Sequence, residues 1–191
     1  MEPLLLASTS PQRRAILAQL RIPFEVVAPE YVEEDPPDAD PIALVRLHAE
    51  EKARSAHADG RITLGVDTTV HLFGRVYGKP DDRADAARIL GDLSGRVHEV
   101  VSGVCLLGPG FGVVDHVVTE VEFRVLTDLD VETYLESGEW EGRAGGYAIQ
   151  GLGARLVASV TGDYLNVVGL PAALLLELLE LHSPELLLLT G

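Results

Sequence analysis

The sequence is poor in cysteine, in basic residues and in long apolar runs. Its single cysteine, Cys105, lies in an apolar stretch, so a disulfide framework is excluded and a packed core thiol is expected. No apolar run approaches the roughly 20 residues that span a bilayer, and no basic segment precedes the first apolar run. These absences predict a soluble protein of the reducing cytoplasm with no membrane partner.

Basic residues are scarce: 15 Lys and Arg stand against 30 Asp and Glu, for a net charge of −15. Because duplex phosphates favour clustered Lys and Arg, no nucleic-acid partner is expected. A nucleotide needs only a local positive pocket, so each cation beside a Gly or Ser turn becomes more informative. Of the 191 residues, 47% are hydrophobic, and no linker tract or internal repeat is present. One compact unit over residues 1–191 is therefore expected.

The apolar pattern predicts helices that interleave with strands early in the chain and two long paired strands later. The expected strands cover residues 4–7, 24–28, 62–66, 97–107 and 113–125, with a hairpin over 69–77 that turns near Gly74. The expected helices cover 11–20, 41–56, 82–93, 129–136 and 170–182. This order predicts the α/β class with a mixed twisted sheet and flanking helices.

The first fourteen residues are the most informative segment. An apolar strand ends in Ser8-Thr9-Ser10, and Pro11 opens a helix that carries Arg13 and Arg14. Ser10 is a good cap, Pro suits the first helical turn, and the free N–H groups and dipole of a helix start attract an anion. This segment predicts a phosphate site. The alternative is a capped helix with solvated arginines.

Three further segments carry possible chemistry. Asp67 follows the apolar strand at 62–66, where it can bind a metal, activate water or merely cap a turn. Lys79 lies between Gly and Pro in a stiff turn, and its alternative is a solvated surface charge. The glycine-rich segments 143–151 and 162–171 indicate positive φ angles or close backbone approach, which structural turns explain equally well.

Taken in order, these segments resemble the Maf family. The matching motifs are Leu6–Arg14, Glu51–Ala53, Gly65–Val70, Gly78–Pro80, Leu93–His98, Ala144–Gly151 and Val168–Pro171. They run collinearly from about residue 4 to residue 182, which is more specific than any one motif. The resemblance implies a nucleoside triphosphate pyrophosphatase that yields NMP and pyrophosphate, uses Mg²⁺, Mn²⁺ or Co²⁺, and removes unwanted nucleotides.

The resemblance also implies a mixed α/β fold similar to that of the inosine triphosphatase group, with two lobes around a cleft, and a homodimer. Members were first associated with inhibition of septum formation. A hypothesis of a different class is therefore a non-catalytic nucleotide-binding regulator of cell division. Asp67 and two lysines favour the enzyme, because a pure binder does not need a proton acceptor.

The family's site residues carry over to this chain position by position. The resemblance makes Ser8, Arg13, Lys52 and Lys79 the phosphate-binding residues. It makes Asp67 the proton acceptor for the attacking water. For a divalent metal it implies Asp67 and an acid of the stretch 30–34, of which Glu33 is favoured.

Three positions bear on the choice of base. Thr68 and Gln150 match the family branch that acts on dTTP and UTP, whereas the branch linked to 7-methyl-GTP typically has Gln and Glu there. A carboxamide donates to a pyrimidine O4 and accepts from N3–H, whereas a carboxylate cannot donate to O4. Gln12 departs from both branches, which usually have Arg and Trp respectively. The resemblance therefore implies a preference for uracil- or thymine-type bases, modified ones included.

Overall fold

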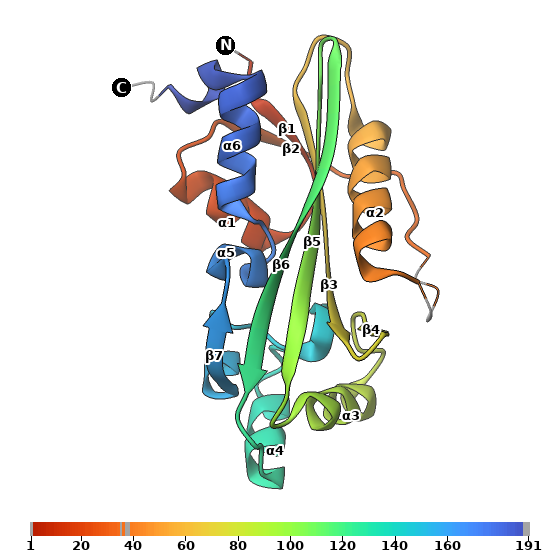
Figure 1. Ribbon diagram of the computed structural model, residues 1–191, viewed down its shortest axis with the longest axis vertical. Helices are drawn as coiled ribbons and strands as arrows, with labels where there is room; N and C mark the ends of the chain where they lie inside the picture. Colours follow the sequence, from red (N-terminus) through yellow and green to blue (C-terminus); the bar gives the residue numbers. More distant parts are fainter. Residues whose placement is uncertain (1, 35, 37–38, 189–191) are drawn as a thin grey trace.

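The computed structural model describes residues 2–34, 36 and 39–188, and a long twisted sheet runs through the middle of the molecule (Figure 1). The strands are β1 (Leu4–Ala7), β2 (Phe24–Val27), β3 (Thr63–Leu72), β4 (Arg75–Tyr77), β5 (Val97–Gly108), β6 (Phe111–Phe123) and β7 (Val157–Thr161). The helices are α1 (Pro11–Gln19), α2 (Pro41–Ala56), α3 (Arg83–Leu93), α4 (Asp128–Glu136), α5 (Tyr164–Val168) and α6 (Ala172–His182). Three short 3₁₀ turns are η1 (Ala144–Gly146), η2 (Leu152–Arg155) and η3 (Pro184–Leu187).

The sheet has the order β2-β1-β3-β5-β6-β7, and β4 pairs with the far end of β3. β1 is parallel to both of its neighbours, whereas each strand in the order β3-β5-β6-β7 is antiparallel to the next. The predicted mixed α/β class is therefore confirmed, as is the pair of long strands, β5 and β6. Among the described residues, no helix combines the length and the apolarity that a bilayer crossing demands.

The prediction for β3 was wrong in one respect that matters for the site. A strand at 62–66 and a separate hairpin from residue 69 were expected, with Asp67 at a strand end. Instead β3 runs unbroken through Asp67, because its antiparallel ladder with β5 extends from Thr63 to His71. The hairpin turn itself is confirmed, with positive φ angles at Phe73 and Gly74.

Side chains at the helix starts explain where the helices begin. Ser10 caps α1, Asp40 caps α2 and Asp82 caps α3, each accepting a hydrogen bond from a backbone N–H of the first turn. Pro11 and Pro41 occupy the first position of their helices, where a missing N–H costs nothing. The cap and the proline predicted for the first helix are both present.

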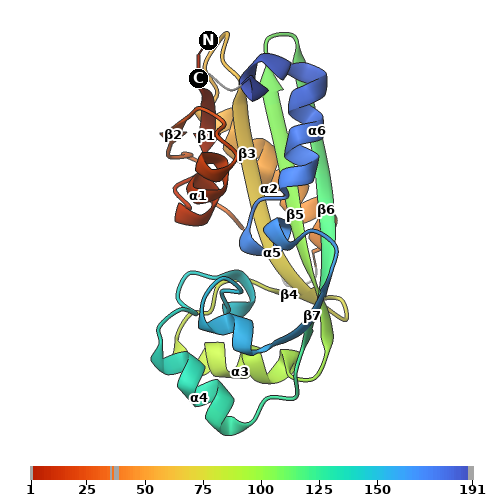
Figure 2. The ribbon, with the colours of Figure 1, turned by 90° about the vertical axis from the view of Figure 1, so that its left-hand side faces the viewer.

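Two hydrophobic clusters divide the molecule. One joins β1, α1 and α6 to the sheet at Val66 and Val104; the other joins α3 and α4 to it at Val70 and Val100. Figure 2 shows these groups of helices at opposite ends of the long strands. Residues 67–69 of β3 lie between the clusters, so the polar part of the strand falls where the two lobes meet.

Helix α2 packs on the opposite face of the sheet from α1 and α6, and two glycines let it approach closely (Figure 1). A Cβ on Gly65 would lie 2.0 Å from the carbonyl oxygen of Ala49, and one on Gly103 would lie 2.2 Å from that of Val45. Cys105 lies at this interface and is fully buried. Burial raises the pKa of its thiol to about 12, as expected for an unreactive core cysteine.

Candidate functional site

A cavity of about 860 Å³ opens between the two clusters. It holds all the residues that the sequence singled out for phosphate, metal and base binding, from six separate segments of the chain. They are Ser8, Gln12, Arg13, Glu33, Lys52, Asp67, Thr68, Lys79 and Gln150.

The strand order explains why the cavity forms there. β1 pairs with β3 only at Leu5 and Leu6, and β4 pairs with β3 only from Val70 onward. The edge of β3 over residues 65–69 therefore has no strand beside it. Helices α1 and α2, which follow β1 and β2, lie on opposite faces of the sheet, so the carboxyl end of β1 is a topological switch point (Figure 2). Ligands of open α/β sheets bind at such points.

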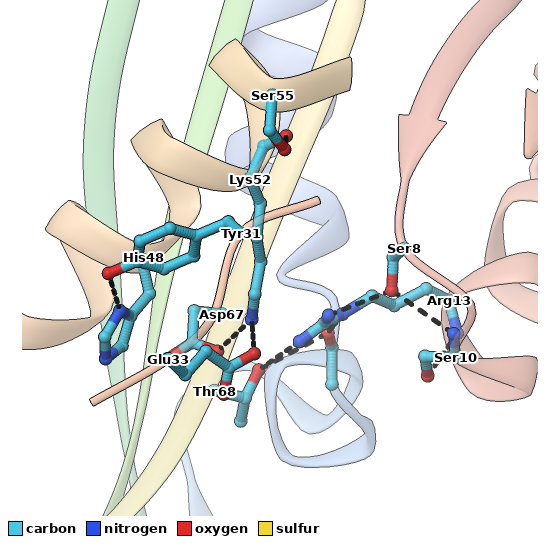
Figure 3. A network of polar contacts seen from close by, with 11 residues as sticks. Ser8, Ser10, Arg13, Tyr31, Glu33, His48, Lys52, Ser55, Asp67 and Thr68 are labelled. Atoms are coloured by element: carbon cyan, nitrogen blue, oxygen red, sulfur yellow. Dashed lines mark hydrogen bonds and ion pairs between the residues drawn. The ribbon is translucent and has the colours of Figure 1, made fainter. Parts of the chain in front are cut away.

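Arg13 ties three segments together at the end of β1 (Figure 3). Its Nε donates to the carbonyl of Gly169 at 2.9 Å, one terminal nitrogen donates to Ser8 Oγ at 3.1 Å, and the other donates to Thr68 Oγ1 at 3.2 Å. Burial lowers the pKa of the guanidinium, and the nearby Asp67 carboxylate opposes this shift. Arginine stays protonated under such shifts, so Arg13 is a fixed positive charge with donors left for a ligand.

Thr68 lies beside this arginine. Its hydroxyl is 2.8 Å from the Ser102 hydroxyl on β5 and accepts from Arg13. The role predicted for Thr68 in base choice stays a prediction, and the geometry gives this side chain a second effect, because it helps to orient Arg13. Gln12 lies nearby, where its side-chain oxygen accepts from Ser10 Oγ at 3.2 Å.

Lys52 stands between two carboxylates in Figure 3. Its Nζ lies 2.6 Å from Asp67 Oδ1 and 2.5 Å from Glu33 Oε1, and its side chain is only 7% exposed. The close approach of α2 to β3 at Gly65 brings Lys52 and Asp67 together from two elements. Glu33 comes from the loop before α2. The three residues thus form a compact charged group across the free edge of β3.

The loop that carries Glu33 is anchored to α2 by an aromatic pair. The Tyr31 hydroxyl lies 2.9 Å from His48 Nδ1, and the two rings are 5.5 Å apart. His48 lies one helical turn before Lys52. Burial raises the pKa of Tyr31, and the carboxylates around it raise it further, so the phenol stays neutral. The pair fixes the loop two residues from Glu33.

Lys79 and Gln150 line other parts of the cavity wall and are both exposed. Lys79 follows β4, and its side chain makes no polar contact within the described part of the chain, so its charge is available to a ligand. Gln150 lies in a turn after η1, where Gly145 and Gly146 both have positive φ. Positive φ at these glycines confirms one expectation for this segment.

The Maf family profile, described as a Maf-like protein, matches residues 3–182. The chain belongs to the Maf family. A dTTP/UTP pyrophosphatase of Symbiobacterium thermophilum is 48% identical over 174 residues, which cover 90% of this chain and 89% of the relative. A dTTP/UTP pyrophosphatase of Moorella thermoacetica is 45% identical, with 97% of each chain covered. The family resemblance expected from the collinear motifs is confirmed.

A solved HAM1 protein from Coxiella burnetii has the same fold as this Maf protein. The structures superpose with a TM-score of 0.52 at 16% identity, covering 94% of this chain and all of the other. The expected similarity to the inosine triphosphatase-like fold is thereby confirmed at the level of fold.

The sequence analysis gave no role to several residues at or near the cavity of this Maf protein. Tyr31 and His48, which hold the Glu33 loop, depend on a contact across that loop, and no pattern of spacing reveals it. Arg143 lines the cavity with a buried Nε that has no hydrogen-bond partner in the described residues. Glu139 also lines the cavity and accepts a hydrogen bond from the backbone N–H of Leu152. The sequence feature that could have indicated Glu139 is the pair of acidic residues that flank Trp140.

Proposed function

We propose that this protein is a nucleoside triphosphate pyrophosphatase that hydrolyses dTTP, UTP or related modified nucleotides to the monophosphate and pyrophosphate. The observation that carries the proposal is the convergence of Arg13, Lys52, Lys79 and Asp67 on one cavity of a chain that is otherwise strongly acidic. The names of the relatives support it. Removal of unwanted nucleotides from the cellular pool is the role that follows.

The cations are proposed to bind the triphosphate. A triphosphate carries about four negative charges near neutral pH, and positioning with electrostatic stabilisation supplies most of phosphoryl-transfer catalysis. Arg13 and Ser8 lie at the start of α1, where backbone N–H groups add to their donors. Lys79 approaches from the other lobe. Substrate binding would draw Lys52 toward phosphate, because its present partners are two carboxylates that repel the substrate.

A divalent cation fits the two carboxylates. Asp67 and Glu33 already converge on one positive charge, the Lys52 ammonium. The described residues contain no group of three or more His, Cys, Asp or Glu that could hold a metal ion by itself. Two carboxylates, with substrate phosphates completing the shell, are a common way to bind Mg²⁺. We propose Asp67 and Glu33 as the ligands, and the bound ion would polarise the phosphate oxygens and lower the pKa of a nearby water.

Asp67 is proposed to orient and deprotonate the water that attacks the α-phosphorus. The carboxylate is 8% exposed and held in place by Lys52, so it is fixed on the floor of the cavity. Attack at the α-phosphorus forms a new P–O bond and breaks the bond to the β-phosphate bridge. Pyrophosphate then leaves with the negative charge that the lysines and Arg13 stabilise.

The resemblance and the sequence also support cellular assignments. We propose that residues 1–191 act as one unit, in the cytoplasm, as a homodimer whose partner is the nucleotide substrate. The acidic composition supports the absence of a nucleic-acid partner. The regulator hypothesis, in which the protein binds a nucleotide without hydrolysis, requires no role for Asp67.

The function is tested by measuring pyrophosphate release over a panel of nucleoside triphosphates and metals. We expect a divalent metal to be required and dTTP and UTP to give the highest kcat/KM. Nucleotide binding by calorimetry without pyrophosphate release from any triphosphate would contradict the enzyme and support the regulator. Release of orthophosphate instead of pyrophosphate would contradict attack at the α-phosphorus.

Gln150→Glu is expected to lower the use of UTP and dTTP more than the use of GTP. The substitution keeps the size of the side chain but leaves only acceptors, so a pyrimidine O4 would face a carboxylate with no proton between them. Loss of a hydrogen bond to a polar edge can shift discrimination strongly. The measurement is the ratio of kcat/KM for UTP to that for GTP. An unchanged ratio would show that Gln150 does not contact the base.

A further inference from the structure

The turn that carries Gln150 is stabilised by a backbone hydrogen bond within it and by side chains that lie outside it. The Gly151 N–H donates to the carbonyl of Ala148 at 3.1 Å, which closes the turn around Gln150. The Gln150 side chain is exposed and lines the cavity, whereas Ile149 beside it is buried in the same cluster as Tyr134. The turn therefore presents one polar side chain from a fixed backbone.

Two side chains brace this turn, one on each side of Gln150. The Tyr134 hydroxyl accepts from the Ala148 N–H at 2.9 Å, and a Glu139 carboxylate oxygen accepts from the Leu152 N–H at 2.8 Å. Tyr134 lies on α4 and is 2% exposed, and burial raises its pKa to about 12. It is thus a neutral phenol fixed in the second cluster. Glu139 lies three residues beyond the end of α4 and lines the cavity.

Glu139 fits against the turn at a glycine. A Cβ on Gly151 would lie 2.2 Å from Glu139 Oε2 and 2.6 Å from its Cδ, so any larger residue would displace the carboxylate from this position. The carboxylate therefore packs on the residue directly after Gln150 while it accepts from the residue beyond. A hydrogen bond from a backbone N–H to an ionised carboxylate is stronger than one between neutral groups.

We propose that Glu139 is a specificity-determining positioning residue, which holds the turn so that Gln150 meets the base edge in one orientation. This inference rests on the proposed function. Discrimination between bases requires polar groups held in fixed geometry by their surroundings. In a loose turn the Gln150 amide could reorient to hydrogen-bond with either base. Glu139 acts through the backbone of residues 151–152 and makes no contact with the nucleotide.

The test compares Glu139→Ala, which removes the acceptor, with Glu139→Gln, which keeps an oxygen in the same place. Binding of non-hydrolysable UTP and GTP analogues is measured by calorimetry. We expect Glu139→Ala to lower the preference for UTP by about 10-fold, the loss that accompanies one charge-assisted hydrogen bond. Glu139→Gln should restore the preference to within about threefold, because its amide oxygen accepts from the same N–H.

The matched control is Glu141→Ala. Glu141 also lines the cavity and has the same charge, yet its side chain makes no hydrogen bond to the residues that the structure describes. Its removal should leave the preference unchanged. The positioning role is overturned if Glu139→Gln loses as much preference for UTP as Glu139→Ala does, or if Glu141→Ala loses an equal amount. Either result would mean that the negative charge acts on the nucleotide itself.

A second readout needs no nucleotide. Amide hydrogen exchange of residues 148–152 should accelerate at least tenfold in Glu139→Ala and remain near the wild-type rate in Glu139→Gln. Unchanged exchange in Glu139→Ala would overturn the inference even if the wild-type protein hydrolyses UTP. Conversely, wild-type protein that binds the analogues with the expected preference but releases no pyrophosphate would refute the enzymatic function and leave this inference standing.

Discussion

Asp67→Asn is expected to lower the turnover of dTTP and UTP by on the order of 10²–10⁴-fold, the usual contribution of a positioned general base. Asparagine has nearly the same shape, and its amide oxygen can still accept from Lys52, which now donates to Asp67 at 2.6 Å. The substitution removes the proposed proton acceptor and one negative charge, so turnover should fall more than stability. The measurement is kcat by pyrophosphate release, with thermal unfolding to confirm that the variant is folded.

Asp92→Asn is the matched control for this substitution. Asp92 lies on α3, outside the cavity, in an ion pair with Arg88. Surface pairs of this kind contribute little, so its turnover should equal that of the wild type. A folded Asp67→Asn protein with near-normal turnover would remove Asp67 from the mechanism and direct attention to Glu33.

Gly65→Ala is expected to destabilise the protein by about 3 kcal/mol, at the upper end of overpacking effects. The new methyl group would meet the Ala49 carbonyl oxygen at 2.0 Å and the Ala53 nitrogen at 2.8 Å, both of them backbone atoms of α2. The helix must move away as a body, because its backbone cannot yield locally. Urea unfolding with an unchanged m-value measures the loss, and turnover should fall as well, because Lys52 moves with α2.

Gly91→Ala provides the opposite control. Gly91 is an exposed glycine within α3, and a Cβ there meets nothing within 4 Å. Alanine should therefore raise stability by about 0.5–1 kcal/mol through helix propensity alone. If Gly65→Ala changes the free energy of unfolding by less than about 0.5 kcal/mol, the range of ordinary surface substitutions, then α2 is not held against β3 as the structure indicates.

Much of the site could be predicted because its residues lie in short local motifs. Ser10 and Pro11 define a helix start from their chemistry alone, and Arg13 follows at a fixed distance along that helix. The collinear motifs then placed Lys52, Lys79 and Gln150 in one family pattern, and the structure brings all three to the same cavity.

The remainder depends on contacts that sequence periodicity does not encode. The strand containing Asp67 continues through two threonines because β5 supplies a complete ladder on one side. Strand β7 and helix α5, which were not expected, have five residues each, too few to show a period. The brace from Glu139 to Leu152 joins residues in different turns, so only the packed structure reveals it.

The hydrogen bond from Arg13 to Gly169 spans 156 positions of the chain, and this separation has a consequence for biosynthesis. A nascent chain that has emerged through β6 already contains Asp67 and Lys52, together with the strand that supports them. Its first arginine still lacks the carbonyl that orients it, and α6, which completes the cluster around β1, has not been made. Contacts between residues so far apart in the sequence form late in folding. The end of the cavity that is proposed to bind phosphate is therefore completed last during synthesis, so an unfinished chain lacks the complete cavity.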